Sequence, residues 1–143
     1  MELNVKLDKG AYLPERAYKR DAGFDLRIPK TGTQKYILPG NNSLTIDTGV
    51  HVQIPEGYVG FLKSKSGLNV KQGITSEGVI DSGYTGSIVV KLYNNSKNTK
   101  EFECGDKITQ LVIIPVANID NLKVVYELQN TERGSKGFGS SGN

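Results

Sequence analysis

Three aspartates near glycines stand out in this sequence by their context: Asp25 in Asp21-Ala-Gly-Phe-Asp-Leu26, Asp81 in Gly78-Val-Ile-Asp-Ser-Gly-Tyr-Thr-Gly86, and Asp106 in Gly105-Asp-Lys-Ile108. An aspartate in such a place is most often a turn former, since its side chain bonds the nearby backbone. Asp81 differs from the other two. The β-branched pair Val79-Ile80 precedes it, and a Gly-Tyr-Thr-Gly turn and an apolar run follow it. This layout predicts a hairpin whose mouth presents a carboxylate able to take a proton from water, as a general base does.

A second chemical signal is the basic segment Lys63-Ser-Lys-Ser-Gly-Leu68, with two cations and two hydroxyls before a glycine. Donors of this kind beside a helix N-terminus commonly hold phosphate, although a solvated basic loop has the same composition. The chain has one histidine, His51, and one cysteine, Cys104. These are too few for a transition-metal cluster of soft ligands, while a hard cation held mainly by a ligand's phosphates stays compatible. His51 lies in an alternating strand pattern, which indicates a surface or half-buried position.

The C-terminal arm, residues 131–143, differs in composition from the rest of the chain. It has four glycines and a single apolar residue, Phe138. Such a segment buries too little to fold alone, so a frayed tail is one interpretation. The other is a clamp on a ligand, because Arg133 offers a fork for phosphate oxygens, glycines let the backbone approach an anion, and a ring can cover a flat base.

The elements that position these residues are β-strands nearly throughout. Short runs rich in Val, Ile, Leu, Tyr and Thr recur, and Gly, Pro, Asn or Asp separates them. The runs cover residues 3–7, 44–46, 50–54, 59–62, 88–93, 108–114 and 122–128. With 17 glycines, this pattern predicts an antiparallel sandwich, jelly roll or barrel. The one helix we expect is a turn or two at residues 66–71.

Bulk composition sets the remaining limits. A chain of 143 residues is one domain's worth. Its net charge of +3 suits a polyanionic small ligand and does not call for a nucleic-acid partner. A single cysteine points to a reducing compartment. With no apolar stretch of membrane-spanning length and no signal-peptide pattern at the start, the sequence predicts a cytoplasmic protein.

Five segments, taken in order, resemble the five motifs of the trimeric dUTPase family, and the resemblance covers nearly the whole chain. Each motif alone is weak evidence, but five in order with matching chain length are specific. The segments are Ala22-Gly-Phe-Asp-Leu26, Lys65-Ser-Gly-Leu68, Gly78-Val-Ile-Asp-Ser-Gly-Tyr-Thr-Gly86, Gly105-Asp-Lys-Ile-Thr-Gln-Leu111 and Arg133-Gly-Ser-Lys-Gly-Phe-Gly-Ser-Ser-Gly142.

This resemblance implies an all-β, single-domain jelly roll or distorted β-barrel over residues 1–130, with residues 131–143 as a flexible arm. It implies a homotrimer with active sites shared between subunits, the arm closing over a neighbour's site. The implied reaction hydrolyses dUTP to dUMP and pyrophosphate, which keeps uracil out of DNA and supplies dUMP for thymidylate synthesis.

The resemblance also assigns roles to residues. Asp81 matches the aspartate that activates the water attacking the α-phosphorus, and Tyr84 matches the tyrosine that packs on deoxyribose and leaves no room for a 2′-hydroxyl. Hairpin backbone near Val79, Ile80 and Val89 would read the uracil edge. Phosphate-contacting positions are Lys65, Ser66, Gly67 and Gln110. Arm residues that would cover the nucleotide are Arg133, Gly137, Phe138, Gly139, Ser140 and Ser141. Asp25 matches an aspartate that steadies Mg²⁺ through water, the ion riding mainly on the triphosphate.

The sequence departs from the family pattern at positions that affect the geometry of the site more than the reaction, and two alternative functions stand beside the main one. Lys65 stands where arginine is usual, Ser64 where proline is common, and Ser87 where glutamate is frequent. Lysine keeps the charge but loses the bidentate fork. A dCTP deaminase shares the implied fold, yet it uses a glutamate near the hairpin and generally lacks the Arg-Gly-x-x-Gly-Phe-Gly tail. A dUTPase that also binds a repressor protein is the other alternative.

Overall fold

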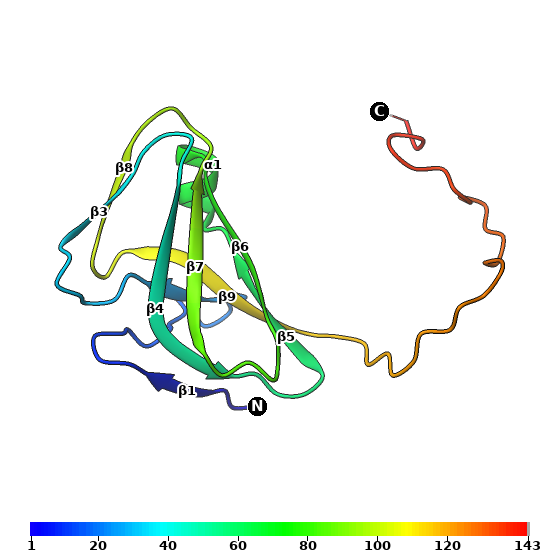
Figure 1. The fold of residues 1–143 in the computed structure, drawn as a ribbon, viewed down its shortest axis with the longest axis horizontal. Helices are drawn as coiled ribbons and strands as arrows, with labels where there is room; N and C mark the ends of the chain where they lie inside the picture. Colours follow the sequence, from blue (N-terminus) through cyan, green and yellow to red (C-terminus); the bar gives the residue numbers. More distant parts are fainter. Residues whose placement is uncertain (143) are drawn as a thin grey trace.

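The computed structural model describes residues 1–142 and consists of nine strands and one short helix (Figure 1). The predicted all-β class with one short helix is confirmed. In chain order the elements are β1 (Asn4–Leu7), β2 (Gly23–Arg27), β3 (Lys35–Leu38), β4 (Ser43–Gln53), β5 (Tyr58–Lys63), α1 (Ser66–Gln72), β6 (Ile74–Ile80), β7 (Ser87–Asn94), β8 (Lys100–Glu103) and β9 (Lys107–Pro115).

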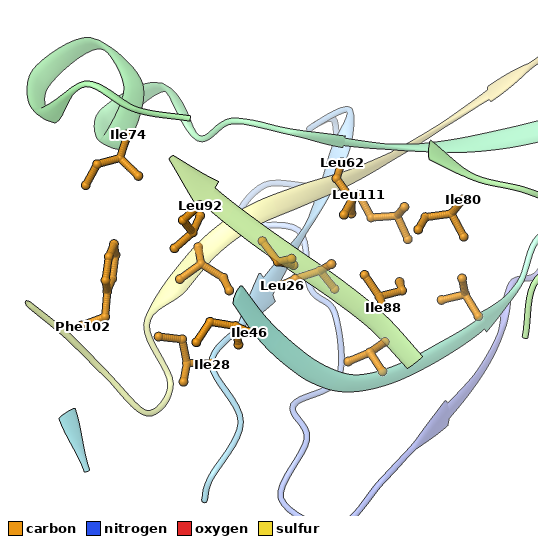
Figure 2. Packing of buried hydrophobic residues seen from close by; sticks show 14 of the residues in the cluster. Leu26, Ile28, Ile46, Leu62, Ile74, Ile80, Ile88, Leu92, Phe102 and Leu111 are labelled. Atoms are coloured by element: carbon orange, nitrogen blue, oxygen red, sulfur yellow. The ribbon is translucent and has the colours of Figure 1, made fainter. Parts of the chain in front are cut away.

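Seven strands form one antiparallel sheet in the order β1-β4-β7-β6-β5-β9-β2, and β3 pairs with β8 beside it. The sheet curls, so that its concave face encloses a single apolar core (Figures 1 and 2). Side chains from β2, β4, β7 and β9 meet there, among them Leu26, Ile46, Ile88 and Leu111 (Figure 2). The alternation of buried and exposed positions along β7 is the period of two that a half-buried strand requires.

Most of the predicted strand runs are present, and two of them merge. Residues 44–46 and 50–54 fall in and beside the single strand β4, because Gly49 takes a left-handed φ of +66° at a register shift and lets the chain bend without leaving the sheet. The structure adds β2, β3, β6 and β8. β2, β3 and β8 are short and contain charged residues, and in β6 the apolar pattern before Val79 is interrupted by Ser76, Glu77 and Gly78. Gly78 is required by packing, because a Cβ there would lie 2.9 Å from Leu62 Cδ1.

The strand predicted at residues 122–128 is wrong for the single chain. Residues 116–142 carry no helix or strand, and Figure 1 shows this part leaving the body as an extended trace after β9. Leu122, Val124, Tyr126 and Leu128 are exposed. Their alternation is that of a strand, but no neighbouring strand of the same chain is within reach to pair with it. Asn143, the last residue of the predicted arm, lies outside the described residues.

Within residues 1–142, no helix has the length and apolar character needed to cross a membrane.

Candidate functional site

The hairpin predicted around Asp81 is present and opens toward its turn. β6 and β7 pair at Ile74–Ser76 with Leu92–Asn94. Beyond that point β6 and β7 no longer pair with each other. Residues 77–80 of β6 pair with β5, and most of β7 pairs with β4. The two strands therefore separate as they approach the hairpin turn, residues 81–86. Where the two strands separate, their backbone N–H and C=O groups that face each other are free to form hydrogen bonds with the edge of a flat ligand.

Asp81 and Tyr84 lie together in this hairpin turn. The Tyr84 N–H donates to the Asp81 carbonyl at 3.0 Å, which closes the turn. The Tyr84 hydroxyl donates to the Ser87 carbonyl at 2.8 Å, and its ring lies over Gly86, where a Cβ would overlap the phenol. Gly86 is therefore needed to seat the ring. Both the Asp81 carboxylate and half of the Tyr84 side chain remain open to solvent.

The three hydrophobic residues assigned to base recognition lie on the two sides of the opening. Val79 on β6 and Val89 on β7 are 61% and 49% exposed, whereas Ile80 is 7% exposed and packs into the core. Ile80 can meet a ligand through its backbone, while the side chains of Val79 and Val89 are free to contact one. The strand alternation produces this division, since successive side chains point to opposite faces.

The basic segment leads from β5 into α1, and its Lys65 is held by Asp25. Asp25 is 5% exposed, and each of its carboxylate oxygens meets a lysine: one binds Lys65, and the other lies 2.7 Å from Lys107 Nζ. Burial alone raises the pKa of Asp25, but hydrogen bonds and charges from Lys107 and Lys65 outweigh it and hold this pKa below its ordinary value. Ser66 and Gly67 begin α1 with exposed positions.

Ser64 and Gln110 fasten this segment to the sheet. The Ser64 hydroxyl donates to the Ser76 carbonyl at 3.2 Å and accepts from the Ser76 N–H at 2.9 Å. Gln110 Nε2 donates to the Ser64 carbonyl at 3.1 Å. Gly23 on β2 leaves the space that the Gln110 side chain occupies, since a Cβ there would lie 2.6 Å from its Oε1. Serine at position 64 thus makes two bonds that a proline could not make.

These two groups of residues lie at opposite ends of β6. Ile80, next to Asp81, pairs with Gly60, whereas Glu77 pairs with Lys63, near the basic segment. The four steps from Glu77 to Asp81 span about 13 Å of extended chain. Figure 1 shows the same separation, with α1 at the top of the view and the hairpin turn at the bottom. One chain does not bring Asp81 together with Lys65, Ser66 and Gly67.

The predicted arm residues form a third group, away from both. Arg133 Nε donates to the Lys136 carbonyl at 3.0 Å in a local turn, and Phe138 is fully exposed. Gly137, Gly139, Ser140 and Ser141 lie in local turns, in which the Ser140 N–H donates to the Gly137 carbonyl at 3.2 Å. Among residues 1–142, no three His, Cys, Asp or Glu side chains gather closely enough to hold a metal ion.

Sequence reasoning missed Lys107 and Gly86. Lys107 lies in the fourth of the five motifs, but its pairing with Asp25 depends on the β2–β9 register, in which Asp25 faces Gln110 and Arg27 faces Lys107. The role of Gly86 could have been predicted, because a glycine two residues after an aromatic residue in a tight turn leaves room for the aromatic ring. Asp106 proves to be a turn former, with its carboxylate accepting from the Glu103 N–H at 2.8 Å.

A family model described as dUTPase matches residues 9–142 of this chain. The deoxyuridine 5'-triphosphate nucleotidohydrolase of Tropheryma whipplei is 41% identical over 140 residues, covering 95% of this chain and 92% of the relative. That of Escherichia phage T5 is 38% identical over 146 residues and covers 98% of each chain.

Solved structures agree. A mutant dUTPase of Staphylococcus bacteriophage 80alpha with dUpNHpp superposes with a TM-score of 0.89 at 34% identity, covering 99% of both chains. A dUTPase mutant of phage phi11 of S. aureus, described for its coordination of a structural Mg(II) ion, gives 0.79 at 32% identity over 89% of this chain and 98% of that one. Similarity over this length confirms the predicted jelly-roll fold.

Proposed function

This chain belongs to the dUTPase family, and on that premise we propose that it hydrolyses dUTP to dUMP and pyrophosphate. The observation that carries the proposal is the parted β6–β7 hairpin, whose turn holds Asp81 and Tyr84 side by side at the open end. This arrangement provides backbone groups that can bond the edge of a base, a ring on which a sugar can pack, and a carboxylate that can accept a proton from water.

In the proposed reaction Asp81 accepts a proton from water as the water oxygen bonds to the α-phosphorus. The bond from the α-phosphorus to the bridging oxygen breaks, and pyrophosphate leaves. Tyr84 packs on the sugar, and its fixed ring, bonded to the Ser87 carbonyl and seated on Gly86, excludes a 2′-hydroxyl. Backbone at Val79, Ile80 and Val89 reads the uracil edge. A polar readout of this kind rejects a wrong base strongly, because that base leaves buried groups unpaired.

Phosphates would be held by Lys65, Ser66, Gly67 and Gln110. Mg²⁺ fits this site as an ion carried by the triphosphate, since no carboxylate cluster for it exists among residues 1–142. When bound, it offsets negative charge on the leaving pyrophosphate. Asp25 would act on it only through water, because both of its oxygens are already engaged by Lys65 and Lys107.

We propose further that the active enzyme is a homotrimer with shared sites. The distance between Asp81 and the basic segment supports this, because a water activated by Asp81 must lie within a few ångströms of the phosphates that Ser66 and Gly67 contact. A second subunit can supply what one chain separates. The arm, residues 131–143 beyond a body of 1–130, would then close over a neighbour's site and place Arg133, Phe138, Ser140 and Ser141 on the nucleotide.

The proposed location is cytoplasmic, which agrees with the free thiol of Cys104.

A second, regulatory role is also proposed. The 80alpha dUTPase with dUPNHPP is 35% identical to this chain, with a TM-score of 0.89 over 99% of both chains. It is described as one of the phage dUTPases that control transfer of virulence genes by a proto-oncogenic G protein-like mechanism. Recovery of a repressor protein from host lysate in a nucleotide-dependent way would support that role, and nucleotide-independent recovery would contradict the switch.

The test of the main proposal is an assay of pyrophosphate release from dUTP, dCTP, dTTP and UTP, with and without Mg²⁺. We expect release from dUTP alone, increased by the metal. Release from UTP at a similar rate would remove Tyr84 from its role. Ammonia release from dCTP would indicate the deaminase instead.

A further inference from the structure

A chain of hydrogen bonds connects the hairpin turn to the loop after β1. His51, on β4, bonds the Thr85 carbonyl through Nδ1 at 2.8 Å and the Asp8 carboxylate through Nε2 at 3.0 Å. Asp8 is itself fixed, since its backbone N–H donates to the Gly49 carbonyl at 2.8 Å. The His51 side chain is 17% exposed. Of the two strand positions predicted for His51, surface or half-buried, it takes the half-buried one, and its ring also connects Asp8 and Thr85, which are 77 residues apart.

Both partners of the ring are acceptors only. A peptide carbonyl has no proton to give, and a carboxylate has none at neutral pH. Both ring nitrogens must therefore carry hydrogen for both bonds to form, which means that the complete chain of bonds requires the imidazolium form of His51. A neutral ring keeps one N–H and loses one of the two contacts.

Thr85 lies between Tyr84 and Gly86 in the hairpin turn, and His51 is opposite Ser87 in the β4–β7 register. The Ser87 carbonyl accepts from the Tyr84 hydroxyl, and the Ser87 hydroxyl donates to Asp47. We propose that Asp8 and His51 are positioning residues, which hold the Thr85 carbonyl and so fix the Tyr84 ring and Asp81 for catalysis. This inference rests on the proposed function of Tyr84 as the sugar gate.

The charges around His51 favour the cation. The hydrogen bond to Asp8 and then that to the Thr85 carbonyl raise the pKa of His51 above its ordinary value, and they outweigh the opposing effects of desolvation and of the nearby charge of Lys6. Asp47 on the same strand also attracts the ring. The sign follows directly: the complete chain of bonds exists below the folded-state pKa of His51 and is lost as pH rises through it.

Since His51 is the only histidine, NMR titration of the full-length protein gives its pKa without ambiguity. We expect a value above that of a histidine in a model peptide, and a decrease in Asp8→Asn, whose amide leaves the ring without a carboxylate. A pKa at the peptide value, or one unchanged in Asp8→Asn, would overturn the proposal. This readout does not depend on any enzymatic activity.

The kinetic test is the ratio of kcat/KM for dUTP to that for UTP as a function of pH. Ionisation of Asp81 affects both substrates and cancels in the ratio, so a fall of the ratio at high pH reports the hairpin turn. We expect His51→Ala to lower the ratio about tenfold at neutral pH, a moderate loss for a slightly misplaced group. His51→Gln keeps a donor for Thr85 but no charge, so it should give an intermediate ratio without pH dependence.

Gln53→Ala is the matched control. Gln53 is on the same strand and bonds Asn4 of β1 at 3.0 Å, yet makes no hydrogen bond to the hairpin turn within residues 1–142. Its ratio should equal that of the unaltered chain. An unchanged ratio in His51→Ala would overturn the inference even if dUTP is hydrolysed well. If the unaltered chain released no pyrophosphate from dUTP, the proposed function would fail, and the His51 titration would still decide the imidazolium form.

Discussion

Phe102 in β8 and Phe138 in the C-terminal arm are both phenylalanines, but they lie in opposite environments. Phe102 is 1% exposed and belongs to the apolar core, whereas Phe138 is fully exposed between two glycines. Strands β1 to β9 obtain their backbone partners and apolar contacts from within the chain. Residues 131–142 have neither, so in the proposed trimer their order would come from a ligand and a neighbouring subunit. On this proposal the strands provide the stability of the fold, and the arm provides closure over the substrate.

The largest effect should come from the body, at the hairpin turn. Asp81→Asn removes the proton acceptor but keeps the size of the side chain, so we expect pyrophosphate release to fall by about 10³ to 10⁴ while nucleotide binding persists. The measurements are kcat and calorimetric affinity for a non-hydrolysable dUTP analogue. Asp106→Asn is the control, because Asp106 is an exposed turn former. Near-normal turnover by Asp81→Asn would remove Asp81 from its role.

Phe102→Ala should destabilise the fold without changing the chemistry. Removing a fully buried ring costs about 3 to 5 kcal/mol of unfolding free energy, part of it from the cavity left behind. Urea denaturation at fixed protein concentration measures this loss, since assembly makes stability depend on concentration. A loss below about 1 kcal/mol would mean that Phe102 is less tightly packed than its burial indicates.

Deleting residues 131–143 tests the arm as a whole. The body keeps all nine strands, so the thermal unfolding temperature of the nucleotide-free protein should not change. Activity should fall by about a hundredfold, as expected when groups that position a substrate are lost. A truncated protein that hydrolyses dUTP normally would contradict a closing arm, and one that unfolds earlier would show that the arm also supports the body.

Asp25→Asn tests the ion pairs behind the basic segment. It leaves Lys65 and Lys107 without a carboxylate, and we expect a loss of about 2 kcal/mol, less than for a fully buried pair because both lysines are partly exposed. Since the pKa of Asp25 is held below its ordinary value, its contribution is complete above the unfolded-state pKa and disappears as pH falls through the folded one. The difference in unfolding free energy between Asp25→Asn and the unaltered chain should therefore shrink in acid. A constant difference would assign the loss to packing.

Local pattern predicted what depends on neighbours in sequence. The hairpin at Asp81 and the helix after Lys65 both come from turn residues and adjacent apolar runs, and both are present. The environment of Asp25 could not be predicted, because it joins residues 40 and 82 positions apart through strand register. Residues 122–128 show a case in which the local pattern predicted a strand that the single chain does not form. Their alternation is that of a strand, but a strand also needs a partner, and the sequence does not say which chain provides it.

Phe138→Ala is the smallest expected change and the sharpest test of the comparison between body and arm. If the ring meets uracil only in the closed complex, its loss should lower kcat/KM for dUTP about tenfold, within the range measured for a base stacked on an aromatic residue. Thermal unfolding of the nucleotide-free protein should not change, in contrast to Phe102→Ala. Phe138→Trp, which keeps a flat ring, should retain most of the activity. A lower unfolding temperature for Phe138→Ala without nucleotide would mean that the ring already packs on a subunit before substrate binds. In that case the ordering entropy is lost during assembly, and closure of the arm no longer depends on the ligand.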